Sequence, residues 1–401
     1  MQSHFFILAL SVCCAHTMSF GFDEGPRFYE RTEDGNKIDK ASVKMLKEAY
    51  NEATDKNVVM SPIAVLMLLN LYVSNTPASK LQEEVLALTG DTNARDAKIS
   101  QMRLLDNFLG RAGYALSMKN KVYVSKDYTI SDKFAATARD LHSEFDRINF
   151  HDLKSAVATI NAWSEKETNG HLKDVVSEKM LDPATATALF NVIFFQGHWH
   201  VPFKAAETKD KDFHVDSKTT VKKPMMTLER PLMYGENKEI GARFIELPYK
   251  EDGFRMVVAL PDEIDGLPKV VEKMSNKGLL DDVFALNVGQ SEVILELPRF
   301  EIKADLDFNK ILPKLGVNKI FSESVADIVK ERAVVVDKVF QKAFVKVDEE
   351  GATAGAFTGA IMVPMSSNYQ IPPPINFKVD RPFAFTILYR DIILFIGTYT
   401  H

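Results

Sequence analysis

The chain carries at residues 349–368 the sequence EEGATAGAFTGAIMVPMSSN, followed by three prolines at 372–374. If residues 351–361 are extended, successive side chains point to opposite faces. One face then holds only small residues, namely Ala352, Ala354, Ala356, Thr358 and Ala360. Alanine and glycine are poor formers of an ordinary strand. We infer that the segment is suited to enter between two packed strands, where bulky side chains would overpack the interior.

The hydrophobic periodicity of the chain breaks down across residues 347–383. Prolines 372–374 have no amide hydrogen to offer a sheet and favour extended geometry. A segment this long without regular structure inside a compact domain is usually functional or disordered. Disorder would not explain the apolar run Ile361-Met362-Val363. We therefore predict a functional loop over about residues 349–376.

Regular patterns flank this loop on both sides. Apolar residues at three- and four-residue spacing predict helices over 41–53, 64–72, 80–88, 97–109, 132–141 and 155–167. Ser61 and Pro62 are a predicted cap and first-turn proline. Predicted strands cover 191–195, 254–260, 292–297, 339–347, 384–389 and 392–396, the last two joined by a two-residue hairpin. Helices first and antiparallel strands later indicate an α+β fold.

The N-terminal segment differs from the rest of the chain. Residues 1–20 contain no Asp, Glu, Lys or Arg, and the apolar run at 5–15 is too short to span a bilayer. This pattern is typical of a secretory signal peptide at 1–19, cut after Ala15 or Ser19. Both cysteines, Cys13 and Cys14, lie within it. We therefore expect a secreted, extracellular protein without disulfides, folded as one domain over 20–401.

Composition argues against several classes of function. The net charge is −6 with both signs mixed, whereas a nucleic-acid binder needs a concentrated basic surface. No dense Lys/Arg stripe suggests heparin or membrane binding. The motifs of common hydrolases and phosphate loops are absent. His198 and His200 flank Trp199, but two ligands do not make a metal site. We expect neither an enzyme nor a metal or cofactor site.

Several short motifs occur in the order found in the serpins, and together they cover nearly all of the chain after the N-terminal segment. The chain resembles that family at Asn57-Val-Val-Met-Ser-Pro62, Asn161-Ala-Trp163 with Thr168-Asn-Gly170, Asn191-Val-Ile-Phe-Phe-Gln-Gly-His-Trp199 with Pro202-Phe203, Leu247-Pro-Tyr249, Leu297-Pro-Arg-Phe300, Leu315-Gly316 and Asp380-Arg-Pro-Phe383. Each motif is weak alone, but the ordered set is specific. The resemblance implies the serpin fold, with helices around a large mixed sheet, smaller sheets and an exposed reactive-centre loop.

The resemblance also assigns roles within the loop. The hinge of the family corresponds to Glu349, Glu350, Gly351, Ala352, Thr353, Ala354, Gly355 and Ala356. Counted from Glu349, the seventeenth residue is Met365, which places the reactive bond at Met365–Ser366, with Met362, Val363 and Pro364 as neighbours. The sequence Pro-Met-Ser at this place is similar to antitrypsin. Tyr369 is a minor alternative cleavage position. Support for sheet opening is implied for Ser61, Asn191, Trp199 and Gln341.

The family mechanism implies a monomer that forms a covalent complex with a serine protease of elastase or chymotrypsin type. Insertion of the cleaved loop into the main sheet is an established property of serpins rather than an inference from this sequence. Two departures from the family pattern concern side-chain size. Ala352 replaces the usual Thr or Ser, but it is small enough for insertion. Phe357 interrupts the run of small residues, but it lies on the outward face, where a bulky side chain is tolerated. Gln341 stands where many members have His, yet still donates and accepts hydrogen bonds. The alternative is a non-inhibitory carrier, storage or chaperone protein, and a cysteine protease target is left open.

Overall fold

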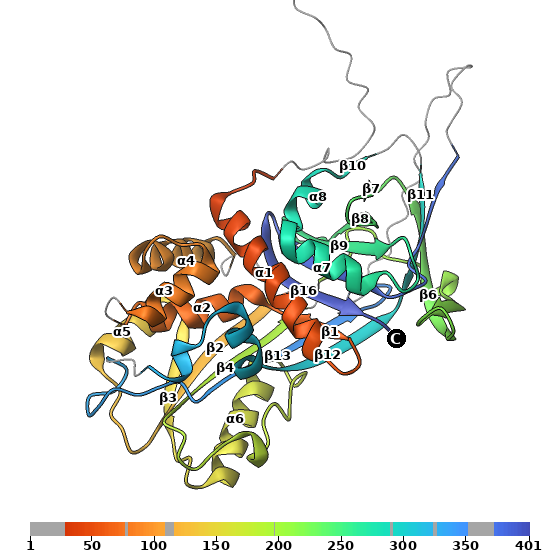
Figure 1. Ribbon diagram of the computed structural model, residues 1–401. Helices are drawn as coiled ribbons and strands as arrows, with labels where there is room; N and C mark the ends of the chain where they lie inside the picture. Colours follow the sequence, from red (N-terminus) through yellow and green to blue (C-terminus); the bar gives the residue numbers. More distant parts are fainter. Residues whose placement is uncertain are drawn as a thin grey trace, which may run out of the picture.

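Three β-sheets form the framework of the protein, seen in a computed structural model (Figure 1). The structure describes residues 29–76, 79–108, 116–195, 197–288, 292–323, 327–351 and 373–401. The predicted signal peptide and loop residues 352–372 lie outside this set. The reactive bond, its neighbours, Tyr369 and hinge residues 352–356 therefore remain sequence-based predictions.

The sheet that leads into the loop has five strands in the order β12-β13-β4-β2-β3. Their bounds are Phe300–Asp307 for β12, Lys338–Val347 for β13, Thr187–Phe195 for β4, Leu116–Ser125 for β2 and Ser143–Ile148 for β3. The sheet is mixed: β13 pairs with β4 and β2 with β3 in parallel, whereas the other neighbours are antiparallel. Every residue of β4 is buried, because elements cover both faces at this point.

The second sheet has seven strands, and all its pairings are antiparallel. Its order is β1 (Val58–Met60), β16 (Ile392–Tyr399), β15 (Phe383–Tyr389), β9 (Phe254–Pro261), β8 (Ala242–Pro248), β7 (Met233–Asn237) and β10 (Asn287–Val288). Arg390 and Asp391 join β15 to β16, and Arg390 takes the positive φ of 55° that so tight a turn requires. The predicted two-residue hairpin is confirmed.

The third sheet has four strands and receives the chain as it returns from the loop. Its order is β14 (Ile375–Lys378), β11 (Val293–Pro298), β6 (Thr220–Arg230) and β5 (Lys209–His214). Only β11 of this sheet was predicted from sequence. The segment 209–214 is rich in lysine and aspartate, and Pro224 follows two lysines in the segment 220–230, so neither shows the alternation of a half-buried strand.

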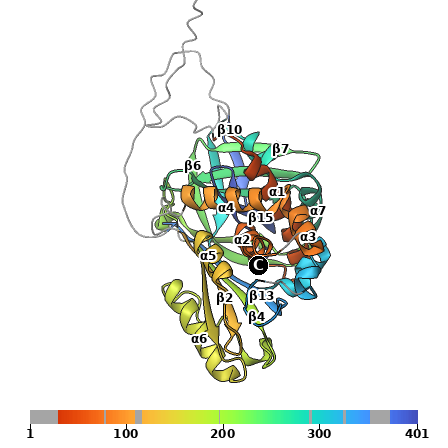
Figure 2. The ribbon, with the colours of Figure 1, turned by 90° about the vertical axis from the view of Figure 1, so that its left-hand side faces the viewer.

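Helices cover the five-stranded sheet on both faces. On one side α2 (Pro62–Val73) lies between this sheet and the seven-stranded one, and all of its residues are buried. On the other side lies α6 (Leu153–Glu167), whose Ile160 and Trp163 belong to the same buried apolar cluster as residues of β4 and β13 (Figures 1 and 2). The Trp163 ring meets Tyr123 of β2 edge-on. Pro62 occupies the first turn of α2 as predicted, but the Ser61 side chain makes no capping hydrogen bond.

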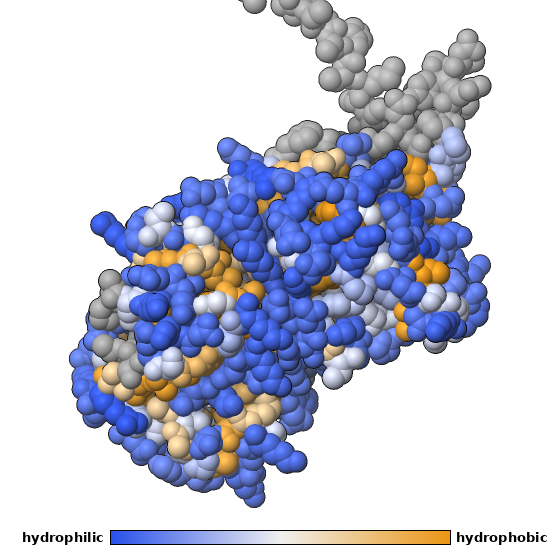
Figure 3. Space-filling view, in the orientation of Figure 1, coloured by the Kyte–Doolittle hydropathy of each residue, from blue (hydrophilic) through white to orange (hydrophobic). Residues whose placement is uncertain are grey.

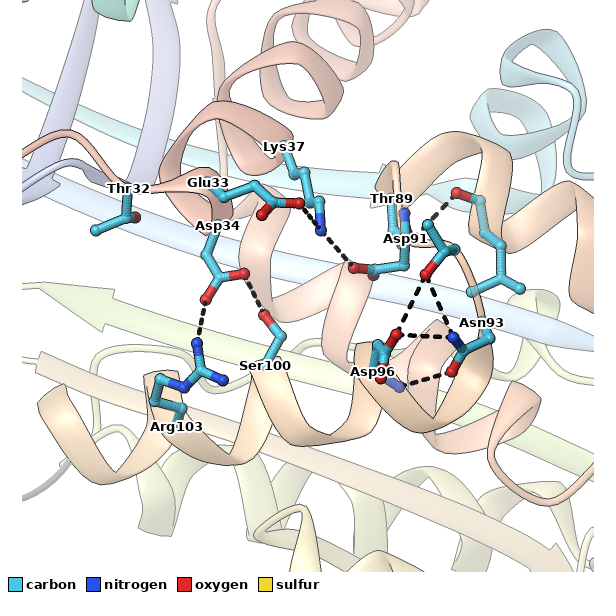
Figure 4. Close-up of polar contacts among 12 residues, drawn as sticks. Thr32, Glu33, Asp34, Lys37, Thr89, Asp91, Asn93, Asp96, Ser100 and Arg103 are labelled. Atoms are coloured by element: carbon cyan, nitrogen blue, oxygen red, sulfur yellow. Dashed lines mark hydrogen bonds and ion pairs between the residues drawn. The ribbon is translucent and has the colours of Figure 1, made fainter.

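The remaining helices complete the covering layers. They are α1 (Glu33–Glu52), α3 (Lys80–Thr89), α4 (Ala94–Phe108), α5 (Asp132–Asp140), α7 (Leu267–Lys277), α8 (Leu280–Phe284) and α9 (Phe308–Ile311). All six helices predicted from periodicity are present; their ends differ by at most three residues, except that α1 begins at Glu33 rather than at residue 41. Figure 4 shows how α1 is fixed to its neighbours: Asp34 accepts a 2.6 Å hydrogen bond from Ser100 of α4, and Lys37 forms an ion pair with Asp91, which follows α3.

Hydrophilic side chains cover most of the face in Figure 3, and its apolar areas are small. Within the described residues, the exposed large apolar side chains are Ile99 and Met102, both on α4. No helix in that part of the chain is long and apolar enough to cross a bilayer.

Candidate functional site at the β13–β4 seam

The hinge residues that directly follow β13 are held by the segment that follows β4. The backbone N–H of Trp199 donates to the Glu350 carbonyl at 3.2 Å, and that of Phe203 donates to the Glu349 carbonyl at 2.8 Å. The Trp199 indole Nε1 donates to the Asp348 carbonyl at 2.8 Å. Three hydrogen bonds from residues 199–203 therefore fix the point at which the chain leaves the sheet.

The Glu349 side chain reinforces this attachment. The residue is only 7% exposed; its Oε1 accepts a 2.7 Å hydrogen bond from Thr208 Oγ1 and pairs with the Arg299 guanidinium. Burial acts to raise the pKa of the Glu349 carboxyl, but the hydrogen bonds from Thr208 and Arg299 outweigh it, and the net pKa lies below its usual value. Glu349 is therefore a buried, charged anchor at neutral pH.

Among the described hinge residues, Glu349 to Gly351, it is Gly351 that no other amino acid can replace without strain. Its φ is +66°, in the left-handed region that favours glycine. A Cβ at this position would lie 2.4 Å from the Trp199 backbone nitrogen and 2.5 Å from the Gly197 carbonyl oxygen. The close approach of two backbones explains why the motif Glu-Glu-Gly ends in glycine.

Trp199 is itself fixed by aromatic packing. Its ring stacks on Tyr249 with centroids 4.5 Å apart and an interplanar angle of 10°, and it meets Phe203 edge-on at 6.1 Å. Burial raises the pKa of the Tyr249 phenol well above its usual value, with a further contribution from the Glu251 charge, so the ring stays neutral. The aromatic cluster thus gives the hinge a rigid support.

We call the line along which β13 pairs with β4 the seam. Farther from the hinge along this seam, a row of amide side chains crosses three strands. Asn120 of β2, Asn191 of β4 and Gln341 of β13 occupy matching register positions. Gln341 Nε2 donates to Asn191 Oδ1 at 2.9 Å, and Asn191 Nδ2 donates to Asn120 Oδ1 at 2.8 Å. All three residues are at most 5% exposed, so each hydrogen bond is shielded from water.

Gln341 also joins this row to the start of α2. Its Oε1 accepts from the Ser61 backbone N–H at 2.7 Å, and its Nε2 donates to the Ser61 carbonyl at 2.9 Å. The hydroxyl of Ser61 is buried and has no hydrogen-bond partner. Ser61 therefore contributes through its backbone, and Gln341 is the side chain that links sheet, seam and helix.

Next to the amide row the packing is incomplete. A cavity of about 60 Å³ lies where Asn191 and Gln341 meet Leu306, Lys342 and Met180. Protein interiors are otherwise close-packed, with few voids larger than a water molecule. The seam therefore has free space beside its central polar contact.

The seam is a parallel junction within a sheet that is otherwise mostly antiparallel. Eight residue pairs, from Lys338↔Ala188 to Val345↔Phe195, join β13 directly to β4. A chain that leaves the top of β13 and turns back would run antiparallel to both strands. The arrangement can therefore accept one more strand at this junction and replace a parallel ladder by two antiparallel ones, which are slightly more stable per residue.

The structure divides the residues that were expected to support sheet opening into two groups. Ser61, Asn191 and Gln341 form the central polar cluster, whereas Trp199 lies at the hinge end with Glu349, Glu350 and Gly351. Sequence reasoning missed Asn120, Thr208 and Arg299. Arg299 was within a quoted motif, but no local pattern connects positions 208 and 299 to 349.

His198 and His200, which flank Trp199, do not form a metal cluster in the described part of the chain. His198 Nδ1 lies 3.3 Å from Glu251 Oε1, and the described residues contain no group of three or more His, Cys, Asp or Glu side chains suited to a metal ion.

Comparison with known proteins places this geometry in a family. The family described as Serpin (serine protease inhibitor) matches residues 36–401. Antitrypsin of Bombyx mori is 32% identical over 373 residues, which cover 92% of this chain and 93% of that protein. Leukocyte elastase inhibitor of Bos taurus is 30% identical over 350 residues, with 82% and 92% covered.

Solved structures agree. Serpin48, a highly specific serpin in the insect Tenebrio molitor, superposes with a TM-score of 0.80 at 28% identity and covers 93% of this chain and 100% of its own. AtSerpin1 of Arabidopsis, in its native stressed conformation, gives a TM-score of 0.81 at 23% identity, a likeness of fold; 93% of this chain and 99% of that one are covered. The prediction of helices around a large mixed sheet with further sheets is confirmed.

Proposed function

The chain belongs to the serpin family of serine protease inhibitors, and on that premise we propose that it is a secreted, single-use inhibitor of elastase- or chymotrypsin-like serine proteases. In this proposal a protease attacks the bond Met365–Ser366, and the cleaved loop then enters the five-stranded sheet as a new strand between β13 and β4. The protein is consumed by this reaction and is not an enzyme.

The observation that carries the proposal is the direct parallel pairing of β13 with β4, just below the start of the loop. Insertion of an antiparallel strand gives up eight residue pairs along one ladder and forms two ladders in their place. From Gly351 to Met365 an extended chain spans ~46 Å at 3.3 Å per residue. The ten residues of β13 span ~33 Å by the same rise. The loop is therefore long enough to carry Met365 past the far end of the seam.

Trapping begins with the transfer of an acyl group to the protease. The protease serine Oγ bonds to the Met365 carbonyl carbon, the bond to the Ser366 nitrogen breaks, and Ser366 leaves as an amine that takes up a proton. The ester that remains ties the protease to Met365. Water would normally hydrolyse this ester. If insertion carries Met365 away and distorts the protease first, the complex persists; if insertion is slow, the protein becomes an ordinary substrate.

The choice of target rests on Met365. An unbranched, flexible, apolar side chain suits an apolar primary pocket, whereas the pocket of trypsin carries a carboxylate and selects Lys or Arg. The names of the relatives, antitrypsin, antichymotrypsin and leukocyte elastase inhibitor, span several proteases and agree with the general class. We propose secretion because residues 1–19 have the features of a signal peptide, and a monomer because one loop and one sheet suffice for the mechanism.

Incubation with elastase, chymotrypsin and trypsin, followed by a denaturing gel, tests the proposal. We expect a complex with the first two proteases that survives denaturation, and a released C-terminal peptide that begins at Ser366. Cleavage without any complex would favour a non-inhibitory carrier, storage or chaperone role instead. A new N-terminus at another residue, or complexes only with trypsin, would contradict the assignment of Met365.

A further inference from the structure

Two phenylalanine rings face each other across the seam near the hinge. Phe194 of β4 and Phe344 of β13 are register partners, and their rings stack with centroids 5.6 Å apart at 14°. Both residues are almost fully buried, at 4% and 3% exposure, on the face that α6 covers. Their position is next to the uppermost pair of the ladder, Val345↔Phe195, where a strand coming from the hinge would enter.

A third ring lies over this pair. The imidazole of His171 stacks on Phe194 at 4.1 Å and 14°, and on Phe344 at 5.5 Å and 23°. Burial lowers the pKa of His171, which agrees with a neutral ring packed on apolar neighbours. One side chain that belongs to neither strand thus contacts both sides of the junction.

His171 is held in place by the end of α6. The Thr168 hydroxyl donates to the Ser164 carbonyl at 2.7 Å and accepts from the Leu172 N–H at 3.0 Å, while the His171 N–H donates to the Thr168 carbonyl at 3.0 Å. Thr168 and Leu172 are at most 1% exposed, so this turn is part of the packed structure. These hydrogen bonds fix the backbone that carries His171, and the stacking on Phe194 and Phe344 orients its ring, although the residue as a whole remains exposed to solvent.

Insertion of a strand must break this stack. Neighbouring strands lie about 4.8 Å apart, so one additional strand roughly doubles the separation of β13 and β4. The Phe194 and Phe344 rings would then lie roughly 10 Å apart, and His171 could contact only one of them. Other ring contacts behave differently: Lys303 over Phe344 joins β12 to β13, and Tyr123 with Phe190 joins β2 to β4, so each moves as a unit.

A second aromatic pair crosses the seam farther from the hinge. Phe190 and Phe340 are register partners with centroids 5.7 Å apart at a tilted angle of 30°. In the described part of the chain, the ring contacts of Phe190 are to Tyr123 and Phe340, and both of those rings belong to strands of the sheet. Of these two pairs, the described residues place a ring from outside the sheet only over the pair at the hinge end.

We propose that His171, stacked on Phe194 and Phe344, is a positioning residue that controls how fast the seam opens, and thereby the division between trapped protease and cleaved inhibitor. The inference rests on the proposed function, because it assigns the regulation of the same seam. His171 stabilises the closed seam and loses this contact as the strand enters. Its removal should therefore accelerate insertion.

The test uses a synthetic peptide of residues 350–364 added to the uncleaved protein without protease, with incorporation followed on native gels. We expect His171→Ala to incorporate the peptide about five-fold faster. That factor equals about 1 kcal/mol at 1.4 kcal/mol per factor of ten, the size of one aromatic pair. His171→Phe should restore a rate near that of the unmodified protein, and His151→Ala, at another exposed histidine, should leave the rate unchanged. A role in folding alone would not give this aromatic rescue.

A second variant tests the contact itself. Phe344→Leu keeps an apolar side chain but removes the ring, so it should also accelerate incorporation, and adding His171→Ala to it should have little further effect. Equal rates for His171→Ala and the unmodified protein, or equal acceleration by His171→Ala and His171→Phe, would overturn the role of the ring and leave the inhibitory function standing. Failure of the unmodified protein to take up the peptide, together with failure to trap any protease, would overturn both.

Discussion

Replacement of Gln341 by alanine should strongly destabilise the native sheet. Gln341 makes three buried hydrogen bonds of 2.7–2.9 Å, two to the Ser61 backbone and one to Asn191. Each is worth about 1 kcal/mol net, and a buried group left without a partner costs about 1–3 kcal/mol. Alanine leaves the Ser61 N–H, the Ser61 carbonyl and Asn191 Oδ1 without these partners. We expect a loss of about 4 kcal/mol in the free energy of unfolding.

Equilibrium unfolding in urea, read from its first transition, measures this loss. Gln341→His keeps one donor and one acceptor and should recover roughly half of it. Lys346→Ala lies on the same strand with a side chain 51% exposed, so it should change the free energy by less than about 0.5 kcal/mol. A Gln341→Ala protein within about 1 kcal/mol of the unmodified one would refute the reasoning, since the amide row would then carry no stability.

Ala356→Arg should fold normally but be cleaved at Met365 without trapping, because its charge would be buried in the inserted strand at several kcal/mol; Phe357→Arg should be milder, and unchanged trapping by Ala356→Arg would reverse the assigned faces. Mild oxidation should slow association with elastase as Met365 becomes a polar sulfoxide, and Met365→Val should abolish this sensitivity; an unchanged rate with Met365 fully oxidised would point to Tyr369. Burial raises the pKa of the Asp39 carboxyl from 3.8 to about 6, although this carboxyl accepts hydrogen bonds from the Leu279 and Leu280 backbones. The native state therefore binds the Asp39 proton more tightly than the unfolded state. The free energy of unfolding should fall as the pH rises from 3.8 to about 6. Asp39→Asn should flatten the slope, and identical pH profiles of the two proteins would contradict this.

Much of the fold was predictable because its elements carry their own patterns. The apolar residues of 62–73 and the all-buried strands 187–195 and 392–399 give strong local signals. The strand over 116–125 was not predicted, although Ser117, Lys119 and Lys121 alternate with more buried residues as in a half-buried strand. The helix over 267–277 was also not predicted, although Leu267, Val270 and Met274 have the spacing of an amphipathic helix.

The site was predictable only in part. The hinge motif is contiguous in sequence, so Glu349 to Gly351 could be assigned from the loop alone. The partners of Glu349 come from positions 208 and 299, and the ring over Phe194 and Phe344 comes from the end of α6. These contacts depend on how three sheets and α6 come together, and no spacing in the sequence encodes them.

Loop insertion can be measured as the distance between β13 and β2 before and after loop cleavage. A chain that begins at residue 20 has no cysteine, so Lys346→Cys with Lys119→Cys places one spin label on each strand, at side chains 51% and 43% exposed. Lys119 is level with Lys342, four residues from Lys346, so the line between the labels runs obliquely across the strands. We predict that one added interstrand spacing of about 5 Å lengthens the separation of the labels by about 3 Å after cleavage at Met365. An unchanged separation after complete cleavage would show that β13 and β4 remain paired, and would contradict insertion of the loop at this seam.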